Sequence, residues 1–425
     1  MKTISEFQNS TRRESKLPRF VLLTLAVSTA SILLSGSSFG QSIQSNWLNA
    51  VDGDWNDPSN WSTPGFPDNN GTDTFDAVVD ATGASYSVDI DQNITLDNFT
   101  LDSSDATVEL NSNRVLEVLG TADLSAGTFQ LNSGTLRGGT WQTNGGSLII
   151  DSGTFDGATL SGDINLTNSG DRLTLINGGG FTGTANLSGS STDLAIASDT
   201  TLDNTVNLSG SNADLIVNSP QSLTLAADAE VNLTGNNSTI FGGNATSSQL
   251  TNLGTITAGG TDGTNRTISN LAFDNQGTVQ VQDGRTLNVT SASNLVSGTL
   301  TGGIWRAGSN STLDLGSGVI NNAAEIILDG VNSSVQSNNT NTPLEDTLVG
   351  NDTGGILRIL GGRNYTPTTG TIDNAGTIEL GGGSFTQLNN QTGGEIFGFG
   401  NISSPTDNLG SVSYTHLTLP TTPYV

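Results

Sequence analysis

The chain has 425 residues, and Gly, Ser, Thr and Asn together account for 206 of them. Only 12% of the residues are charged, 5% are aromatic and none is cysteine. This composition excludes a multi-helix enzyme, and the regular recurrence of Leu, Ile, Val and Phe argues against disorder. A β-rich repeat protein and a low-complexity linker remain, and periodicity must decide between them.

Charge is distributed unevenly along the chain. The formal net charge is −27, but after Gly40 there are 8 Arg against 38 acidic residues and no Lys, a net charge of −30. A surface this negative repels phosphate backbones and anionic lipids. We therefore expect no nucleic-acid partner.

Residues 1–40 predict a secretory signal peptide. A basic, polar start precedes the apolar run at residues 21–34, which is followed by small residues up to Gly40. This order is typical of signal peptides, and fourteen apolar residues are too few for a membrane anchor, which needs about twenty. We expect cleavage near Gly40 and no transmembrane segment in the mature chain. A single N-terminal anchor is the alternative.

Composition changes again at residues 412–425. Residues 412–421 read VSYTHLTLPT, which resembles the translation of a common sequencing adaptor. The last fourteen residues have no acid, Gly or Asn, and they contain His416, the single histidine of the chain. We expect residues 412–425 to be a non-native tail and the natural sequence to be cut off near Ser411. A natural tail is the alternative.

Between these ends the chain repeats at intervals of 21 to 25 residues. Four units begin with Asn-Leu-Ser or Asn-Leu-Thr, at Asn165, Asn186, Asn207 and Asn232. An aliphatic residue follows each Asn after eight positions, at Leu173, Leu194, Leu215 and Ile240. In the first three units another aliphatic follows two positions later, at Leu175, Ile196 and Val217. This alternation is typical of a strand with one buried face.

Two further sets of matches support the repeat. Asn252, Asn275, Asn322 and Asn374 begin similar pentapeptides at separations of 23, 47 and 52 residues, so each wider gap predicts two units. Residues 131–141, LNSGTLRGGTW, agree with residues 295–305, LVSGTLTGGIW, at eight of eleven positions. Self-similarity at a fixed period is the signature of a repeat architecture.

A repeat of 21 to 26 residues with two or three short strands predicts one coil of an all-β, right-handed parallel β-solenoid. Each coil would pair with its neighbours about 4.8 Å away, with aliphatic residues inside and Asn amide ladders at the corners. We expect the solenoid over residues 98–411, which have room for about thirteen such coils. A leucine-rich horseshoe and a disordered Ser/Thr-rich stalk are the alternatives.

Residues 41–97 differ in composition from the repeats. They contain three of the five tryptophans and three prolines: Trp47, Trp55, Trp61, Pro58, Pro64 and Pro67. A solenoid end exposes unpaired strand edges, which aromatic rings cover and which proline cannot extend. We therefore predict an N-terminal cap. Sugar stacking on exposed tryptophans is the alternative.

These features resemble those of large secreted bacterial β-helical surface proteins of the autotransporter-passenger or haemagglutinin-like adhesin type. The resemblance rests on residues 46–67, NWLNAVDGDWNDPSNWSTPGFP, and on coils such as residues 370–388, GTIDNAGTIELGGGSFTQL. It covers most of residues 46–411 and consists of structural motifs. It implies a protein outside the cell or on the bacterial surface, with glycans or neighbouring cell surfaces as partners. The anchor or translocator of such families is not in this sequence, so the export route stays open.

Few residues are available for catalysis. The chain has no Cys, no Lys after residue 16 and a single His, which excludes most nucleophile–base pairs and zinc sites. Asp171 beside Arg172, and Asp352 ahead of Arg358, have no catalytic spacing. We assign no catalytic, cofactor-binding or metal residue and expect a structural or adhesive protein. A polysaccharide lyase or hydrolase using Asp and Arg is the alternative.

Calcium is the ion that suits so acidic a chain. Residues 52–57, DGDWND, open like an oxygen-rich cation loop, but Asp57 and Thr63 occupy the positions of the required Gly and Glu. The glycine-aspartate nonapeptide of calcium-binding β-rolls is also absent from the sequence. We therefore expect a turn here and no cofactor, with Ca²⁺ as the alternative.

Overall fold

Residues 42–69, 71–243, 247–260, 266–337, 340–403 and 407–418 are described by the computed structural model, with backbone alone for residues 414–418. They belong to the compact unit Gly40–Val425. The predicted signal peptide lies outside the described residues, as do residues 419–425 of the predicted tail. No helix in the described part of the chain is long and apolar enough to cross a membrane.

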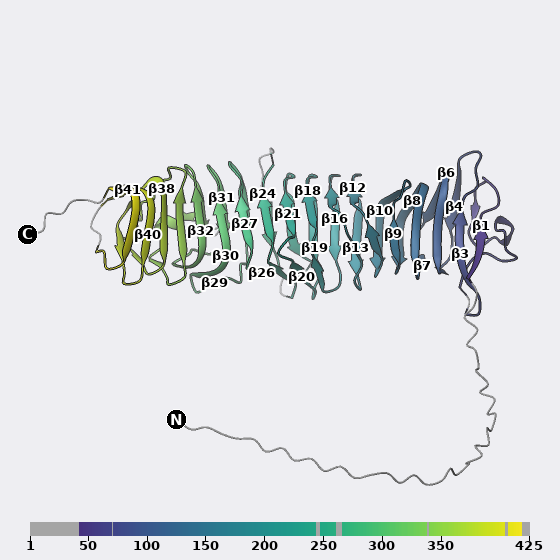
Figure 1. The fold of residues 1–425 in the computed structure, drawn as a ribbon, viewed down its shortest axis with the longest axis horizontal. Helices are drawn as coiled ribbons and strands as arrows, with labels where there is room; N and C mark the ends of the chain where they lie inside the picture. Colours follow the sequence, from purple (N-terminus) through teal and green to yellow (C-terminus); the bar gives the residue numbers. More distant parts are fainter. Residues whose placement is uncertain are drawn as a thin grey trace, which may run out of the picture. The chain divides into compact units, whose positions relative to one another are not determined.

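The described residues are nearly all β-strand, arranged in three sheets that run along the stack of coils (Figure 1). Strand pairing is parallel except for two short antiparallel pairs. The first sheet contains β1 (Ser42–Asn46), β2 (Gly53–Asp54), β3 (Thr74–Val79), β4 (Tyr86–Ile90), β5 (Ile94–Leu96), β6 (Asn98–Leu110), β7 (Val115–Val118), β8 (Thr121–Arg137), β9 (Thr140–Gln142), β10 (Ser147–Asp156), β11 (Thr159–Ser161), β13 (Arg172–Ile176), β14 (Gly180–Phe181), β16 (Asp193–Ile196), β19 (Asp214–Val217), β22 (Thr239–Gly242), β25 (Arg266–Ser269), β28 (Thr286–Val289), β31 (Thr312–Leu315), β33 (Ser334–Ser337) and β34 (Thr342–Pro343).

The other two sheets supply the remaining sides of the coils. The second sheet contains β12 (Ile164–Leu166), β15 (Ala185–Leu187), β18 (Thr205–Leu208), β21 (Glu230–Leu233), β24 (Thr255–Ala258), β27 (Thr278–Val281), β29 (Leu295–Val296), β30 (Thr299–Ala307), β32 (Asn321–Asp329), β35 (Gly350–Asn351), β36 (Ile356–Leu360), β37 (Ile372–Asn374), β38 (Thr377–Thr386), β39 (Leu388–Asn390), β40 (Glu395–Ser403) and β41 (Ser411–Thr418). The third sheet contains β17 (Thr200–Leu202), β20 (Ser222–Leu225), β23 (Gln249–Asn252) and β26 (Ala272–Asn275). Two short 3₁₀ helices, η1 (Pro58–Asn60) and η2 (Leu344–Asp346), lie in loops.

Parallel pairing between successive coils confirms the predicted β-solenoid, which has about 15 turns. The predicted repeat positions stack in register: Leu173 pairs with Leu194, Leu194 with Leu215, and Leu215 with Ile240. All four side chains are completely buried. Period-2 alternation therefore places one aliphatic column inside the coils, as the spacing predicts.

A short motif recurs at three of the corners. In Gly-x-Asn-Ser at Gly235, Gly308 and Gly330, the Ser Oγ donates to the carbonyl of the Gly three residues earlier. The Asn of each motif has a left-handed φ of 53° to 57°. Asn tolerates this conformation better than most residues do. Gly210 at an equivalent corner cannot be replaced easily, because a Cβ there would overlap the carbonyl oxygen of Gly189.

The tryptophans near the N-terminus belong to the core. Trp47, Trp55 and Trp61 are at most 2% exposed, and Trp61 lies 4.6 Å from Trp55 between ring centroids. Trp55 in turn contacts Phe99 on β6, so the rings continue the interior of the coils. Sugar stacking on exposed tryptophans is therefore wrong. Pairing of β1 with β3, and of β3 with β6, shows that residues 41–97 also contribute strands to the first sheet.

At the other end, β41 pairs in parallel with β40. Its residues include the first part of the predicted non-native tail. The backbone of Ser411–Thr418 thus continues the second sheet.

Candidate functional site

The two Asp–Arg pairs considered from the sequence are not brought together as pairs. Asp171 is buried at a corner, where its Oδ2 accepts a hydrogen bond from the Asn168 amide at 2.8 Å. Arg172 instead forms an ion pair with Asp193 on the next coil, 3.1 Å from Nη1 to Oδ2. Arg358 bonds to Glu325 and Glu379 on the coils to either side of it, rather than to Asp352.

The carboxylates of the candidate calcium loop are engaged in local hydrogen bonds. Asp52 Oδ1 accepts from the Ser87 amide at 2.7 Å. Asp57 is the N-cap of η1, and its Oδ1 accepts from the amide and hydroxyl of Ser59. These hydrogen bonds lower the pKa of Asp57. Within the described residues, no group of three or more His, Cys, Asp or Glu side chains is placed to hold a metal ion. Directly after β2, a hydrogen bond of 3.3 Å from the Asp57 amide to the Asp54 carbonyl forms a turn at residues 55–56.

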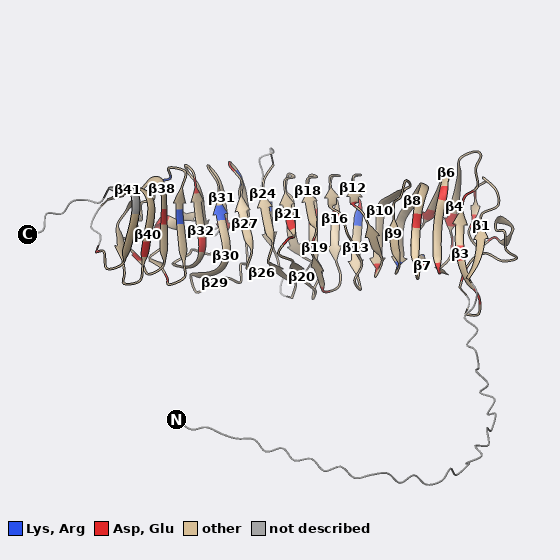
Figure 2. Ribbon diagram, viewed as in Figure 1, with Lys and Arg blue, Asp and Glu red and all other residues tan. Residues whose placement is uncertain are grey.

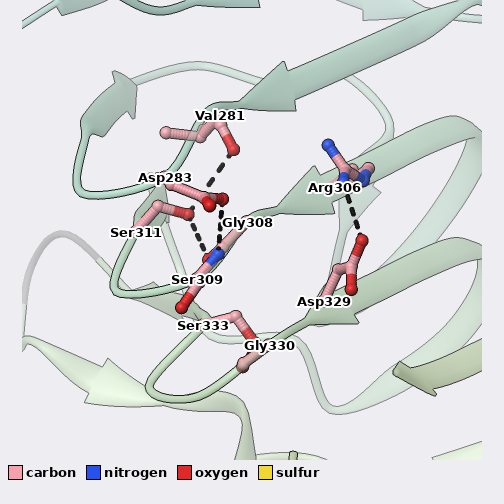
Figure 3. A network of polar contacts seen from close by, with 9 residues as sticks. All are labelled: Val281, Asp283, Arg306, Gly308, Ser309, Ser311, Asp329, Gly330 and Ser333. Atoms are coloured by element: carbon pink, nitrogen blue, oxygen red, sulfur yellow. Dashed lines mark hydrogen bonds and ion pairs between the residues drawn. The ribbon is translucent and has the colours of Figure 1, made fainter. Parts of the chain in front are cut away.

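Charged residues are scattered among many coils, and most of the ribbon is formed by uncharged residues (Figure 2). One cross-coil contact joins Arg306 on β30 to Asp329 on β32, 2.7 Å from Nη2 to Oδ2 (Figure 3). Beside it, Asp283 Oδ1 accepts from the Ser309 amide at the neighbouring corner. These contacts satisfy polar groups between coils. None of these residues lines either recess described below, so we assign them a structural role.

One column does bring Asp and Arg together. Asp193 on β16 and Asp214 on β19 are register neighbours, and Arg172 on β13 precedes them. Burial raises the pKa of both carboxyls, Arg172 opposes the rise at Asp193, and the hydrogen bond from Thr239 opposes it at Asp214. Asp with Arg on one strand face is the kind of arrangement that the enzymatic alternative requires. None of the three residues lines a recess described below.

A recess of about 530 Å³ lies at one corner of four successive coils near the N-terminal end. Four buried aliphatic residues stack in register at this corner: Ile90, Leu110, Leu131 and Ile150. Much of the recess wall comes from the residues that directly follow them in the sequence. The residues that follow them are Asp91, Asn111, Asn132 and Asp151, and Asp89, Arg114 and two serines complete the wall. A smaller recess of about 230 Å³ is lined by residues 178–181 and 199–204.

Sequence reasoning assigned no role to any of these recess residues. The signal available was the dipeptide of an aliphatic and then Asp or Asn, which recurs at residues 90–91, 110–111, 131–132 and 150–151. Its spacing of about twenty residues matches one coil. Inside–outside alternation accounts for the aliphatic member, but only the stacked corner shows that the polar members face a common space.

Comparison of the chain with models of protein families, with curated proteins and with solved structures found no match. The function must therefore be inferred from the residues and their arrangement.

Proposed function

We propose that this chain is a secreted or surface-displayed β-solenoid with a structural or adhesive role, presenting its strand faces and corners to glycans or neighbouring cells. Export is inferred from the basic and then apolar residues 1–34. The acidic composition after Gly40 favours a soluble, outward-facing protein over a nucleic-acid or lipid binder.

The observation that carries this proposal is the cross-coil pairing around a buried aliphatic interior, which runs from β1 to β33 in the first sheet and from β12 to β41 in the second. Without cysteine, backbone ladders and burial are what hold such a chain together outside the cell. The outer surface offers hydroxyls, amides and carboxylates in repeated rows, including Asn186 hydrogen-bonded to Asn165 and Asn207. Repeated polar groups on a stiff support suit multivalent contact with a surface.

Export and adhesion are tested separately. The full chain and a variant lacking residues 1–40 are expressed in a bacterial host, and the protein in the cytoplasm, envelope and medium is quantified with an antibody. We expect the full chain outside the cytoplasm and the truncated chain inside it. Beads carrying the purified protein should then bind polysaccharide-coated or cell-coated surfaces more than beads carrying albumin. Equal retention of the full and truncated chains in the cytoplasm would contradict export. Equal binding by beads carrying the protein and beads carrying albumin would contradict adhesion.

A carbohydrate-active enzyme is the second candidate, and the column of Arg172, Asp193 and Asp214 is the observation that favours it. Carboxyls with raised pKa values beside an arginine suit proton transfer in glycoside cleavage. Hydrolysis or elimination of polygalacturonate by the purified chain, lost in Asp193→Asn and Asp214→Asn, would favour the enzyme. Absence of activity in the parent chain would leave the adhesive proposal in place.

A further inference from the structure

The recess at residues 89–151 differs from the other polar contacts because it contains unpaired groups. Arg114 is exposed, and its guanidinium has no ion pair or hydrogen bond to the described residues. Among the described residues, the seven arginines other than Arg114 each bond to a carboxylate or a backbone carbonyl. A guanidinium has five donors, so Arg114 offers an open set of N–H groups at the recess wall.

The three carboxylates that line the recess with Arg114 each accept a hydrogen bond on one oxygen. Asp89 Oδ1 accepts from Asn111 at 2.9 Å, Asp91 Oδ1 from the Asn56 amide at 3.2 Å, and Asp151 Oδ2 from Gln130 at 3.0 Å. The second oxygen of each has no hydrogen bond to the described residues. The recess wall therefore carries both free acceptors and free donors.

Two local features show that the wall is more than a row of acids. Pairing of β10 with β8 shifts between Ile150 and Ser152, so Asp151 lies at the irregularity and outside the register. Such bulges change the direction of a side chain and are common beside binding sites. In addition, Asn132 Oδ1 is buried without a hydrogen-bond partner. A buried amide oxygen that lacks a donor costs free energy unless a ligand or water supplies one.

Charge and polarity limit the ligand. Three carboxylates and one guanidinium give the recess a net negative charge, which disfavours uronates, phosphates and sulfates. Its carboxylates do not form a cluster that could hold a metal ion. The wall is polar, so an apolar ligand would leave these groups unpaired. A wall that carries both donors and acceptors and has no net positive charge fits a ligand with vicinal hydroxyls or amino groups.

We propose that this recess binds a saccharide with vicinal hydroxyls and no acidic group, either neutral or carrying amino groups. Arg114 donates to hydroxyl oxygens, and Asp91 and Asp151 accept from hydroxyl or ammonium hydrogens of the same ligand. The inference deepens the adhesive function proposed above and rests on it. It places one glycan contact at a defined corner of the coils.

The test is a titration of the purified full chain, followed by calorimetry and by NMR of the sugar. The probes are neutral cello-oligosaccharides, chitosan oligosaccharides and, as the anionic comparison, oligogalacturonate. Arg114→Gln and Asp151→Asn remove the proposed contacts. Arg137→Gln and Asp102→Asn make the same charge changes at exposed positions outside the recess wall. Melting temperatures of all variants establish that each one is folded.

We expect the parent chain to bind a neutral or amino saccharide, and Arg114→Gln and Asp151→Asn to weaken that binding by about tenfold or more, because each removes a charge-assisted hydrogen bond. Arg137→Gln and Asp102→Asn should bind like the parent. Absence of binding to both non-acidic probes, stronger binding of oligogalacturonate, or equal affinity of recess and control variants would overturn the recess proposal. Adhesion of beads that persists with Arg114→Gln would leave the general function standing while this site fails.

Discussion

At the scale of single residues, each buried position is defined by the coils on either side of it. Leu194 is completely buried between Leu173 and Leu215, its register partners. Replacement by Asp would put a charge into this column with no cationic partner. We expect Leu194→Asp to lower the free energy of unfolding by about 3–5 kcal/mol, as for other uncompensated buried charges.

Chemical unfolding followed by circular dichroism measures this effect. Ser190→Asp is the matched control because Ser190 is exposed on the same coil and receives the same charge. Its unfolding midpoint should stay close to that of the parent. If the two variants unfolded at the same denaturant concentration, the interior assignment of Leu194 would be wrong.

Asp214 gives a prediction for pH. Burial raises its folded-state pKa above the ordinary value of 3.8, and the negative charge of Asp193 adds to the rise. The folded protein therefore holds the proton more tightly than the unfolded chain, and stability falls as pH rises from 3.8 through the raised pKa. Asp214→Asn removes this loss while keeping an oxygen for the Thr239 hydroxyl.

We expect Asp214→Asn to melt at a higher temperature than the parent at pH 7, with the difference shrinking as the pH approaches 3.8. Melting curves recorded from pH 3.5 to pH 7 measure it. Asp102→Asn changes an exposed carboxyl outside this column and is the control variant. A destabilised Asp214→Asn at neutral pH would mean that its hydrogen bonds outweigh the cost of burial.

At the scale of strands and corners, asparagine stacks in two different settings. Asn165, Asn186, Asn207 and Asn232 form an outward-facing row on the second sheet, at the strands rather than the corners expected from the sequence. Asn322, Asn351, Asn374 and Asn390 form a buried row linked by side-chain hydrogen bonds of 2.7 to 2.8 Å. The buried row should matter far more for stability, because its polar groups have no water to replace a lost partner.

Asn351→Ala tests this difference. It removes the donor to Asn374 and the acceptor for Asn322, and we expect the free energy of unfolding to fall by about 2 kcal/mol or more. Asn186→Ala, in the outward row, should cost about 1 kcal/mol or less since water can take over its hydrogen bonds. Denaturant titration of both variants measures the two losses of unfolding free energy. Equal losses would show that burial does not distinguish the two rows.

At the scale of the whole stack, the coils are interchangeable modules. Residues 186–206 make one full period of 21 residues, because Asn186 and Asn207 are register partners. Deleting them joins Ala185 to Asn207 and preserves both the alternation and the corner. We expect this variant to fold with a melting temperature near that of the parent and to be about 4.8 Å shorter, the thickness of one coil.

Deleting residues 186–196 instead removes about half a coil, including β16, so that β13 and β19 lose their common register partner. This variant should show a lower and broader melting transition and faster trypsin or pepsin digestion. Similar stability of the two deletions would contradict the modular description. Small-angle scattering supplies the lengths.

The repeat itself explains why so much of the fold could be predicted. Leu173, Leu194 and Leu215 were assigned to the interior from spacing alone, and the gaps around Asn322 correctly predicted an additional coil on either side, one of which contributes Asn351. Each of these features depends on one residue and its chain neighbours, since alternation is local and the period is read directly from the sequence.

Tertiary structure alone decided which polar residues meet. Arg358 contacts Glu325 and Glu379, 33 and 21 residues away, and not the nearer Asp352. Arg114 and Asp151 share a recess although 37 positions separate them. The lengths of the corners and the irregular pairing at Asp151 determine which of these residues come into contact, and both depend on how one coil stacks on the next. The sequence therefore specified the coil and its interior, whereas stacking of the coils determined the polar surface on which a ligand would bind.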